Sequence, residues 1–248
     1  MKIDNAIISS NNTSKYLEFW PFVARAWQRI GITPVLVFLH MRGEEGLIEE
    51  LAKWGKVVPL PLSPSWDVVN QAQCSRLYVA TQLEGTHIIS DADMLPISGG
   101  YFNDTVREIS EDQIISYTAD VIEQGFYLRV PQYPMCYLAG KRETFKEIIG
   151  DFTWENFVLD FARERMGYGS DQRVFYKRLG AWGGKGERFF PLRRGWVEGR
   201  ALNRIDKVKW GWTDSQIEEG ALYDCHMPRP YSENRNLLDP LFKKLEIL

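Results

Sequence analysis

The sequence predicts an α/β fold with a central, mainly parallel mixed sheet that is flanked by helices. Three observations favour this class: apolar strand-like runs alternate with helical patterns over residues 1–97, polar residues follow two of these runs directly, and no internal repeat or low-complexity tract interrupts the order. A β-α-β-α order is typical of parallel sheets covered by helices. The length of 248 residues suits a single domain.

The first part of the chain supplies the strands and helices that define this class. Strand-like runs lie at Ala6–Ser9, Pro34–Leu39, within Lys53–Leu60 and at Thr86–Ser90, and helical patterns lie at Lys15–Ile30 and Trp66–Leu83. Apolar residues recur at helical spacing in both helices. We expect Gly31 to end the first helix, Ser65 to cap the second helix and Gly85 to end it.

The second part of the chain is less regular. We expect strands at Gln113–Thr118 and Met135–Ala139, and helices at Lys141–Ile149, Trp154–Met166 and Asp171–Leu179. Beyond Gly180 the chain is rich in Gly, Trp, Arg and Pro. These residues favour loops, short strands and a tail that packs back across the molecule.

Composition narrows the class of protein. The net charge of −3 argues against a general nucleic-acid binder, and no apolar stretch approaches the roughly 18 residues of a membrane span. The three cysteines are far apart and include no Cys-x-x-Cys pair, which favours a reducing compartment. Because the first residues lack a signal-peptide core, we expect a cytoplasmic protein.

The strongest chemical signal is Asp91-Ala92-Asp93, which follows an apolar strand directly. Two such carboxylates can converge on one hard cation, and a divalent ion that bridges a diphosphate neutralises the charge of a leaving group. Ser9-Ser10-Asn11 ends the first strand, so it should face the same crevice. The alternative is a solvated acidic loop, or Asp91 as the cap of a following helix.

Arg76 lies on the face of the Trp66–Leu83 helix that we expect to be buried. This face is marked at helical spacing by Val69, Ala72, Val79, Ala80 and Leu83. A buried arginine needs an anionic partner. Arg76 could pair with Asp91 or another core carboxylate for structural reasons, or extend to the surface. Alternatively, it organises the acidic motif or reaches a nucleotide.

His226 and Arg229 lie in a loop-like segment, residues 223–231, with too much proline for a helix. Imidazole is a good ligand for Mn²⁺, and an arginine can contact a phosphate through two hydrogen bonds. The alternative for His226 is an ordinary surface histidine. If the tail covers the crevice, His226 lies beside the metal.

Asp171 and Asp120 are candidates for a catalytic carboxylate, and Glu123 competes with them. Asp171 opens a helix, so it could orient a sugar hydroxyl or act as general base on an acceptor. The structural alternative is that Ser170 caps the helix and Asp171 complements its dipole. Asp120 and Glu123 follow the fifth predicted strand, and spacing does not separate the three carboxylates.

Residues Ile88–Ile97 resemble the strand and DxD signature of GT-A glycosyltransferases, in the nucleotide-diphospho-sugar transferase superfamily. Other segments are similar to parts of that family: Ser9–Asn11 to the uridine site, Arg76 to an arginine before the motif, Pro134–Gly140 to a sugar-facing strand, Gly169–Gln172 to an acidic helix start, and His226–Arg229 to a late histidine followed by a basic residue. The compact size is similar to glycosyltransferases encoded by large algal viruses, which would place the protein in a host cytoplasm.

This resemblance implies a Rossmann-like GT-A domain over residues 1–248, with nucleotide binding by 1–97 and sugar or acceptor binding by 98–248. It implies a transfer of a hexose or deoxyhexose from a UDP-sugar to a carbohydrate acceptor. Asp91, Asp93 and His226 would hold Mn²⁺ or Mg²⁺. The residues implied to contact the nucleotide are Ser9, Ser10, Asn11, Arg76, Asp91, Ala92 and Arg229.

Two rival functions are compatible with the sequence. A phosphohydrolase or nucleotidyltransferase also uses paired aspartates, although the motif comes late and Pro96 replaces the Asp-x-Asp-x-Thr pattern of haloacid-dehalogenase-type hydrolases. A non-catalytic carbohydrate-binding domain would retain the fold and bind a nucleotide without turnover. The chain contains neither a P-loop nor a Gly-x-Gly-x-x-Gly motif after its first strand, which argues against simple ATPase and dinucleotide enzymes.

Overall fold

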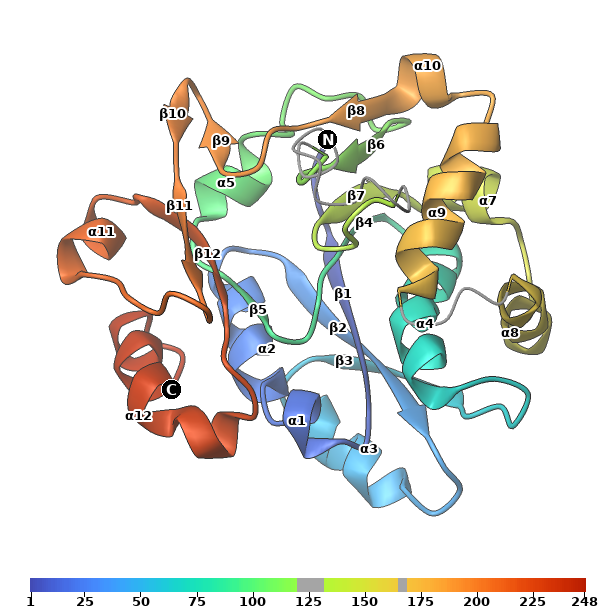
Figure 1. The fold of residues 1–248 in the computed structure, drawn as a ribbon, viewed down its shortest axis with the longest axis horizontal. Helices are drawn as coiled ribbons and strands as arrows, with labels where there is room; N and C mark the ends of the chain where they lie inside the picture. The colour runs from blue at the N-terminus through green and yellow to red at the C-terminus, as the bar shows by residue number, and fades with distance from the viewer. Residues whose placement is uncertain (120–131, 165–168) are drawn as a thin grey trace.

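A computed structural model describes residues 1–119, 132–164 and 169–248 (Figure 1). Its centre is a seven-stranded sheet in the order β3-β2-β1-β4-β7-β6-β8. These strands are β1 (Asn5–Asn11), β2 (Thr33–His40), β3 (Lys56–Pro61), β4 (Thr86–Ile89), β6 (Ile114–Ser116), β7 (Leu138–Lys141) and β8 (Phe189–Pro191). Strands β1 to β4 are parallel to one another, whereas β7 runs antiparallel to β4 and β6. The predicted mainly parallel, mixed sheet is confirmed.

The strands predicted in the first part of the chain are all present. In β2, every residue from Pro34 to Leu39 is buried. A continuous apolar run of this kind is typical of a parallel strand that has helices on both faces. The pattern therefore predicts both the strand and its place inside the sheet.

The helical pattern at Lys15–Ile30 divides into two helices, α1 (Ser14–Leu17) and α2 (Trp20–Arg29). Pro21 lies in the first turn of α2, where its missing N–H is tolerated, so the proline starts a new helix. Gly31 follows α2 with a φ of +81°. This left-handed conformation at a helix end favours glycine, as expected.

Helix α4 (Val68–Gln82) is capped by Asp67, whose carboxylate accepts hydrogen bonds from two backbone N–H groups of the first turn. The expectation that Ser65 caps this helix is wrong. Val69 is 48% exposed and does not belong to the buried face, whereas Arg76 is only 5% exposed. The short helix α3 (Glu45–Ala52), which precedes β3, is not among the predicted elements.

Helices cover both faces of the central sheet (Figure 1). One face carries α4 together with α7 (Arg142–Ile149), α8 (Trp154–Arg163) and α9 (Ser170–Ala181), over a core that includes the stacked rings of Phe157 and Phe161. The other face carries α2 and α5 (Gly99–Asn103), and α12 (Tyr231–Lys244) packs against α2. Helices are thus present at all three places where they are predicted between residues 141 and 179.

A second sheet has the strand order β11-β12-β5. It consists of β5 (Met94–Pro96), β11 (Asn203–Asp206) and β12 (Leu222–His226). Because β12 pairs with β5, the segment that ends at His226 is a strand, and the expectation of a loop there is wrong. The remaining described elements are α10 (Lys185–Arg188), the hairpin β9 (Trp196–Val197) with β10 (Arg200–Ala201), and α11 (Asp214–Glu218).

The tail of the chain packs back across the molecule, as expected. Phe242 of α12 stacks on Phe22 of α2 with ring centroids 4.5 Å apart, and Arg25 donates to the carbonyl of the buried Ile247 at 3.1 Å. In the described ranges, no helix is long and apolar enough to cross a membrane.

Candidate functional site

The polar ends of β1 and β4 lie at the same edge of the central sheet. The two strands are parallel, with Ile7 opposite Ile89, and the Ser90 N–H continues the pairing by donating to the Ile7 carbonyl at 3.0 Å. Ser9–Asn11, the last residues of β1, and Asp91–Asp93, which follow β4, therefore lie at the carboxyl edge of the sheet. Open α/β sheets bind ligands at this edge.

The residues at the end of β1 differ in their surroundings. The Ser9 hydroxyl donates to the carbonyl of Ala72 in α4 at 2.5 Å, so it holds the strand to that helix. Ser10 is 3% exposed, and its hydroxyl donates to the Asn11 carbonyl at 2.9 Å. Ser10 and Ala92 line the same small, mostly apolar hollow. The structure thus brings Ser10 beside the acidic motif and turns the Ser9 hydroxyl toward α4.

Arg76 bridges two carboxylates that come from distant parts of the chain. Its guanidinium donates to Asp91 and to the Ser90 carbonyl, the latter at 2.8 Å, and its Nη2 donates to Asp171 Oδ2 at 2.8 Å. The side chains of Arg76 and Asp171 are 6% and 1% exposed, and that of Asp91 is 35% exposed. The alternative of an ion pair between Arg76 and Asp91 or another core carboxylate is confirmed, and the alternative that Arg76 extends to the surface is wrong; a contact of Arg76 with a nucleotide stays a prediction.

The charges of Arg76, Asp91 and Asp171 depend on one another. Burial acts to lower the pKa of Arg76, but the adjacent Asp91 and Asp171 outweigh it and raise the pKa, so the guanidinium stays charged. Burial raises the pKa of Asp171 against the opposing charge and hydrogen bond of Arg76. Arg76 is therefore a permanent cation behind the acidic motif, and it fixes the backbone there through the Ser90 carbonyl.

The start of α9 places Asp171 against Arg76. Gly169 precedes the helix with a φ of +78°, a conformation that favours glycine. Ser170 is the first residue of the helix and not its cap, so that expectation is wrong. Asp171 lies in the first turn, where the helix dipole favours a carboxylate. Asp120 and Glu123, the competing carboxylates, lie outside the described residues.

Asp93 lies among three basic side chains. The pairing of β12 with β5 is extended by a hydrogen bond from the Met227 N–H to the Asp93 carbonyl at 2.9 Å. This pairing brings His226 Nε2 to within 3.2 Å of Asp93 Oδ2. Arg229 Nε and Lys207 Nζ lie 3.3 Å and 3.7 Å from the same oxygen. Asp93 and His226 therefore meet, as predicted.

The basic neighbours keep Asp93 ionised. Burial acts to raise the pKa of this 5% exposed residue, but the adjacent His226, Arg229 and Lys207 side chains outweigh it and lower the pKa. The alternative of a solvated acidic loop is wrong for Asp93. The alternative that Asp91 caps a helix is also wrong, because strand β5 follows the motif.

The donor atoms at Asp93 and His226 fit a divalent cation. Neighbouring ligands in an octahedral site lie about 3 Å apart when each is about 2.1 Å from the metal, and the two atoms here are 3.2 Å apart. Among the described residues, no three His, Cys, Asp or Glu side chains come close enough together to hold a metal by themselves. A cation held here would need further ligands from a bound phosphate or water, as Mg²⁺ commonly does.

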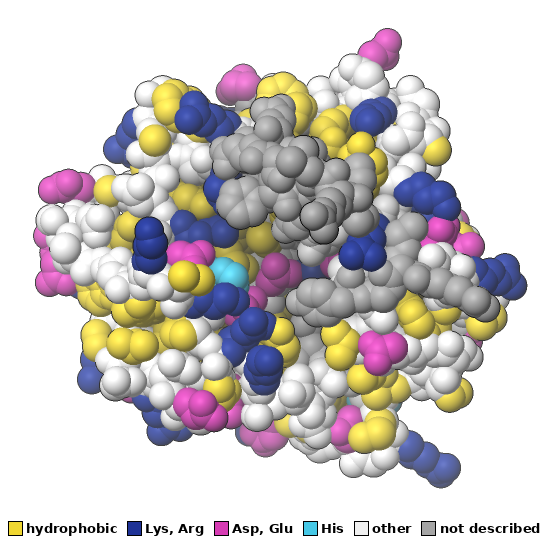
Figure 2. Space-filling view, in the orientation of Figure 1, with side chains coloured by type: hydrophobic (Ala, Val, Ile, Leu, Met, Phe, Trp, Pro, Cys, Tyr) yellow, Lys and Arg dark blue, Asp and Glu magenta, His cyan; other side chains and the backbone are white. Residues whose placement is uncertain are grey.

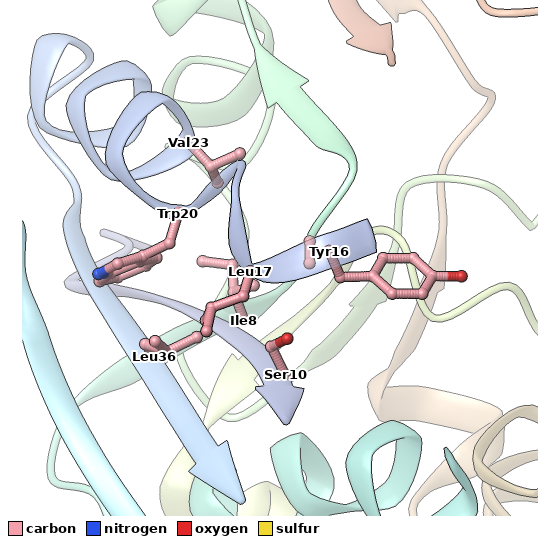
Figure 3. A pocket seen from close by; sticks show the side chains of 8 residues that line it. Ile8, Ser10, Tyr16, Leu17, Trp20, Val23 and Leu36 are labelled. Atoms are coloured by element: carbon pink, nitrogen blue, oxygen red, sulfur yellow. The ribbon is translucent and has the colours of Figure 1, made fainter. Parts of the chain in front are cut away.

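Tyr16 and Arg229 extend the site toward the end of β1. The Tyr16 hydroxyl accepts a hydrogen bond from Arg229, whose guanidinium carbon lies 4.8 Å from the centre of the tyrosine ring. Tyr16 also lines the hollow that Ser10 and Ala92 line, and Figure 3 shows its ring extending away from the other labelled side chains, with the hydroxyl at the far end. Tyr16 could not be identified from the sequence, because a single tyrosine in a helical pattern indicates only packing.

Two further groups were missed by the sequence analysis. Gln172, next to Asp171, has a buried side-chain oxygen without a hydrogen-bond partner among the described residues, and such an acceptor is available to a ligand hydroxyl. Asp224 of β12 is fully buried and accepts two hydrogen bonds from Arg204, each at 2.7 Å, and one from the Tyr137 hydroxyl at 3.0 Å. This network ties β12, and with it His226, to the central sheet.

The charged residues of the site gather on one face of the molecule. Figure 2 shows Lys or Arg and Asp or Glu side chains side by side around a histidine near the middle of that face. Such mixed charge suits a ligand that carries both an anionic group and a bound cation.

Comparison with known proteins supports the fold. No protein-family model and no curated protein matches the sequence. Galactosyltransferase LgtC, in complex with donor and acceptor sugar analogs, is similar with a TM-score of 0.54 and 10% identity, over 97% of this chain and 94% of that chain. An active-site mutant of LgtC gives a TM-score of 0.55 and 10% identity, over 98% and 95%. The chain therefore has the GT-A glycosyltransferase fold over nearly its whole length, while the similarity to algal-virus enzymes stays a prediction.

Proposed function

We propose that this chain is a metal-dependent glycosyltransferase that moves a hexose or deoxyhexose from a UDP-sugar to a carbohydrate acceptor. The observation that carries the proposal is the meeting of Asp93, His226 and Arg229 at the carboxyl edge of a GT-A sheet. The similar structures are those of a galactosyltransferase, one of which holds donor and acceptor sugar analogs. This likeness supports sugar transfer as the class of reaction.

In this proposal Asp93 and His226 would hold Mn²⁺ or Mg²⁺ together with a bound phosphate or water, while Asp91 stays paired with Arg76. When bound, the metal neutralises the charge that develops on the leaving diphosphate. Asp93 is suited to the role because its neighbours keep it ionised. Arg76 donates hydrogen bonds to the Asp91 carboxylate and to the Ser90 carbonyl, and so it holds the backbone that precedes Asp93 in place.

Arg229 and Tyr16 bind the nucleotide in this proposal. The Arg229 guanidinium lies between Asp93 and Tyr16, so it can donate to a diphosphate whose metal is held by Asp93. The Tyr16 ring offers a face on which a nucleobase can stack. Ser10 and Ala92 line the same small hollow as Tyr16, and this proximity supports a nucleoside site between β1 and the acidic motif.

The start of α9 orients the sugar in this proposal. Asp171 is fully engaged by Arg76, and its Oδ1 accepts a hydrogen bond from the Gln172 N–H at 2.9 Å. We therefore assign Asp171 a positioning role. The buried Gln172 oxygen, which lacks a partner among the described residues, accepts a hydrogen bond from a sugar hydroxyl.

The proposal is tested by incubating the protein with a panel of UDP-sugars and simple sugar acceptors, with Mn²⁺ or with EDTA, and measuring UDP release. Release should require the metal, and Asp93→Asn should reduce it by about 100-fold or more. His40→Gln, at a histidine outside the site, is the control and should behave as wild type. Metal-independent release, or none with any donor, would contradict the proposal.

Two further measurements distinguish the rival functions. Pyrophosphate release from a nucleoside triphosphate and a sugar phosphate would indicate a nucleotidyltransferase. Metal-dependent UDP binding without turnover on any donor would indicate a non-catalytic carbohydrate-binding domain.

A further inference from the structure

Lys207 is held beside the Asp93 and His226 pair by a tight turn at the end of β11. Asp206 lies opposite His226 in the pairing of β11 with β12. The Asp206 carboxylate accepts a hydrogen bond from the Val208 N–H at 2.9 Å, and the Lys209 N–H donates to the Asp206 carbonyl at 3.0 Å. Aspartate commonly closes turns in this way. Lys207 therefore projects from a fixed turn next to the site.

The Lys207 ammonium contacts both donors of the proposed metal site. Its Nζ lies 2.7 Å from His226 Nε2 and 3.7 Å from Asp93 Oδ2. Arg229 contacts Asp93 but is turned toward Tyr16. In the described part of the chain, Lys207 is the one basic residue whose side chain contacts both His226 Nε2 and Asp93 Oδ2.

These contacts use the electron pairs that a metal would use. An ammonium group has only hydrogen atoms to donate, so His226 must accept from Lys207 through the lone pair of Nε2. That lone pair is also the one that coordinates a metal. The other ring nitrogen, His226 Nδ1, faces Asp206 Oδ2 at 3.6 Å. Lysine and a divalent cation cannot both occupy the Nε2 lone pair.

We propose that the Lys207 ammonium takes the cation position between Asp93 and His226 when no metal is bound, and so competes with divalent metal for these donors. The inference rests on the proposed function, because it takes both residues as metal ligands. Metal binding displaces the ammonium, whose side chain is 26% exposed and has room to turn outward.

The proposal is tested by titrating Mn²⁺ into nucleotide-free protein and measuring the dissociation constant by calorimetry and by the electron paramagnetic resonance signal of free Mn²⁺. Lys207→Met keeps an apolar stem of similar length and removes the charge. Removing a positive charge about 4 Å from a cation, in a partly exposed site, should tighten Mn²⁺ binding by about tenfold. Lys207→Gln is a second neutral variant in case the methionine variant fails to fold.

Lys209→Met is the matched control, since its side chain lies on the same turn and is exposed. It should change the Mn²⁺ dissociation constant by less than about twofold, and Asp93→Asn combined with Lys207→Met should abolish the gain. If wild type binds Mn²⁺ and both neutral variants bind it equally well or more weakly, the proposed role of Lys207 is overturned and the proposed function is not affected. Binding by the neutral variants but not by wild type would support that role and contradict a metal-dependent wild-type reaction. No binding by any of these proteins would overturn both proposals.

Discussion

Replacing Arg76 by methionine should destabilise the protein by about 3–5 kcal/mol. The change removes the counter-charge of Asp171, whose side chain is 1% exposed, and breaking a buried ion pair from one side costs about that much. Asp91 adds little, because its side chain is 35% exposed and water screens its charge. In a chain of this length each kcal/mol lowers the melting temperature by about 2–4 °C, so a fall of roughly 10 °C is expected.

The assay is urea unfolding of the wild type, Arg76→Met, Asp171→Asn and the double variant. Because the two residues touch, the double variant should lose less stability than the two single changes added together, by about 1–3 kcal/mol. Arg107→Met, which removes only an exposed ion pair with Asp104, is the control and should change stability by less than about 1 kcal/mol. An Arg76→Met protein within about 1 kcal/mol of wild type would refute the bridging role, and so would strict additivity.

Three further predictions concern other parts of the molecule. Burial lowers the pKa of His87, so below about pH 6.5 the unfolded chain takes up a proton that the folded chain does not. The free energy of unfolding should therefore fall as the pH drops below that value. His87→Gln should flatten this pH dependence in urea titrations at about pH 5 to 7. Asp224→Asn should cost about 3–5 kcal/mol in urea unfolding because it leaves Arg204, whose side chain is only 16% exposed, without a counter-charge. A cost below about 1 kcal/mol, as for the exposed control Glu50→Gln, would contradict this expectation. Tyr16→Ala should weaken UDP binding by about tenfold or more in calorimetry, whereas Tyr16→Phe, which keeps the ring, should weaken it less; equal losses would rule out stacking.

The fold class could be predicted because the strands of the first part of the chain are apolar and the helices between them are amphipathic. The errors arise where short-range pattern and tertiary context disagree. Helix α3 was missed because only Leu51 is buried in it, so its apolar spacing is weak. Helix α12 contains Pro240 and a non-helical Asn234, which mask the helical pattern. Strand β12 lies between β11 and β5 and pairs with both, and no local pattern predicts these pairings.

The acidic motif and its partners could be predicted in part. Arg76 was identified because a charge in an apolar stripe needs an anion, and the structure supplies Asp91 and Asp171. The proximity of His226 to Asp93 depends on strand pairing over more than a hundred residues, so the sequence could offer it only through resemblance. Lys207 could not be predicted, because its position depends on the register between β11 and β12.

The most direct test of the account is UDP binding by wild type and Asp93→Asn, each measured by calorimetry with and without Mn²⁺. Asp104→Asn, at an exposed surface ion pair, is the control. The account predicts that Mn²⁺ tightens UDP binding by about tenfold or more in wild type and in Asp104→Asn, and has no effect in Asp93→Asn. A full Mn²⁺-dependent gain in Asp93→Asn would contradict the claim that this carboxylate holds the metal on the diphosphate.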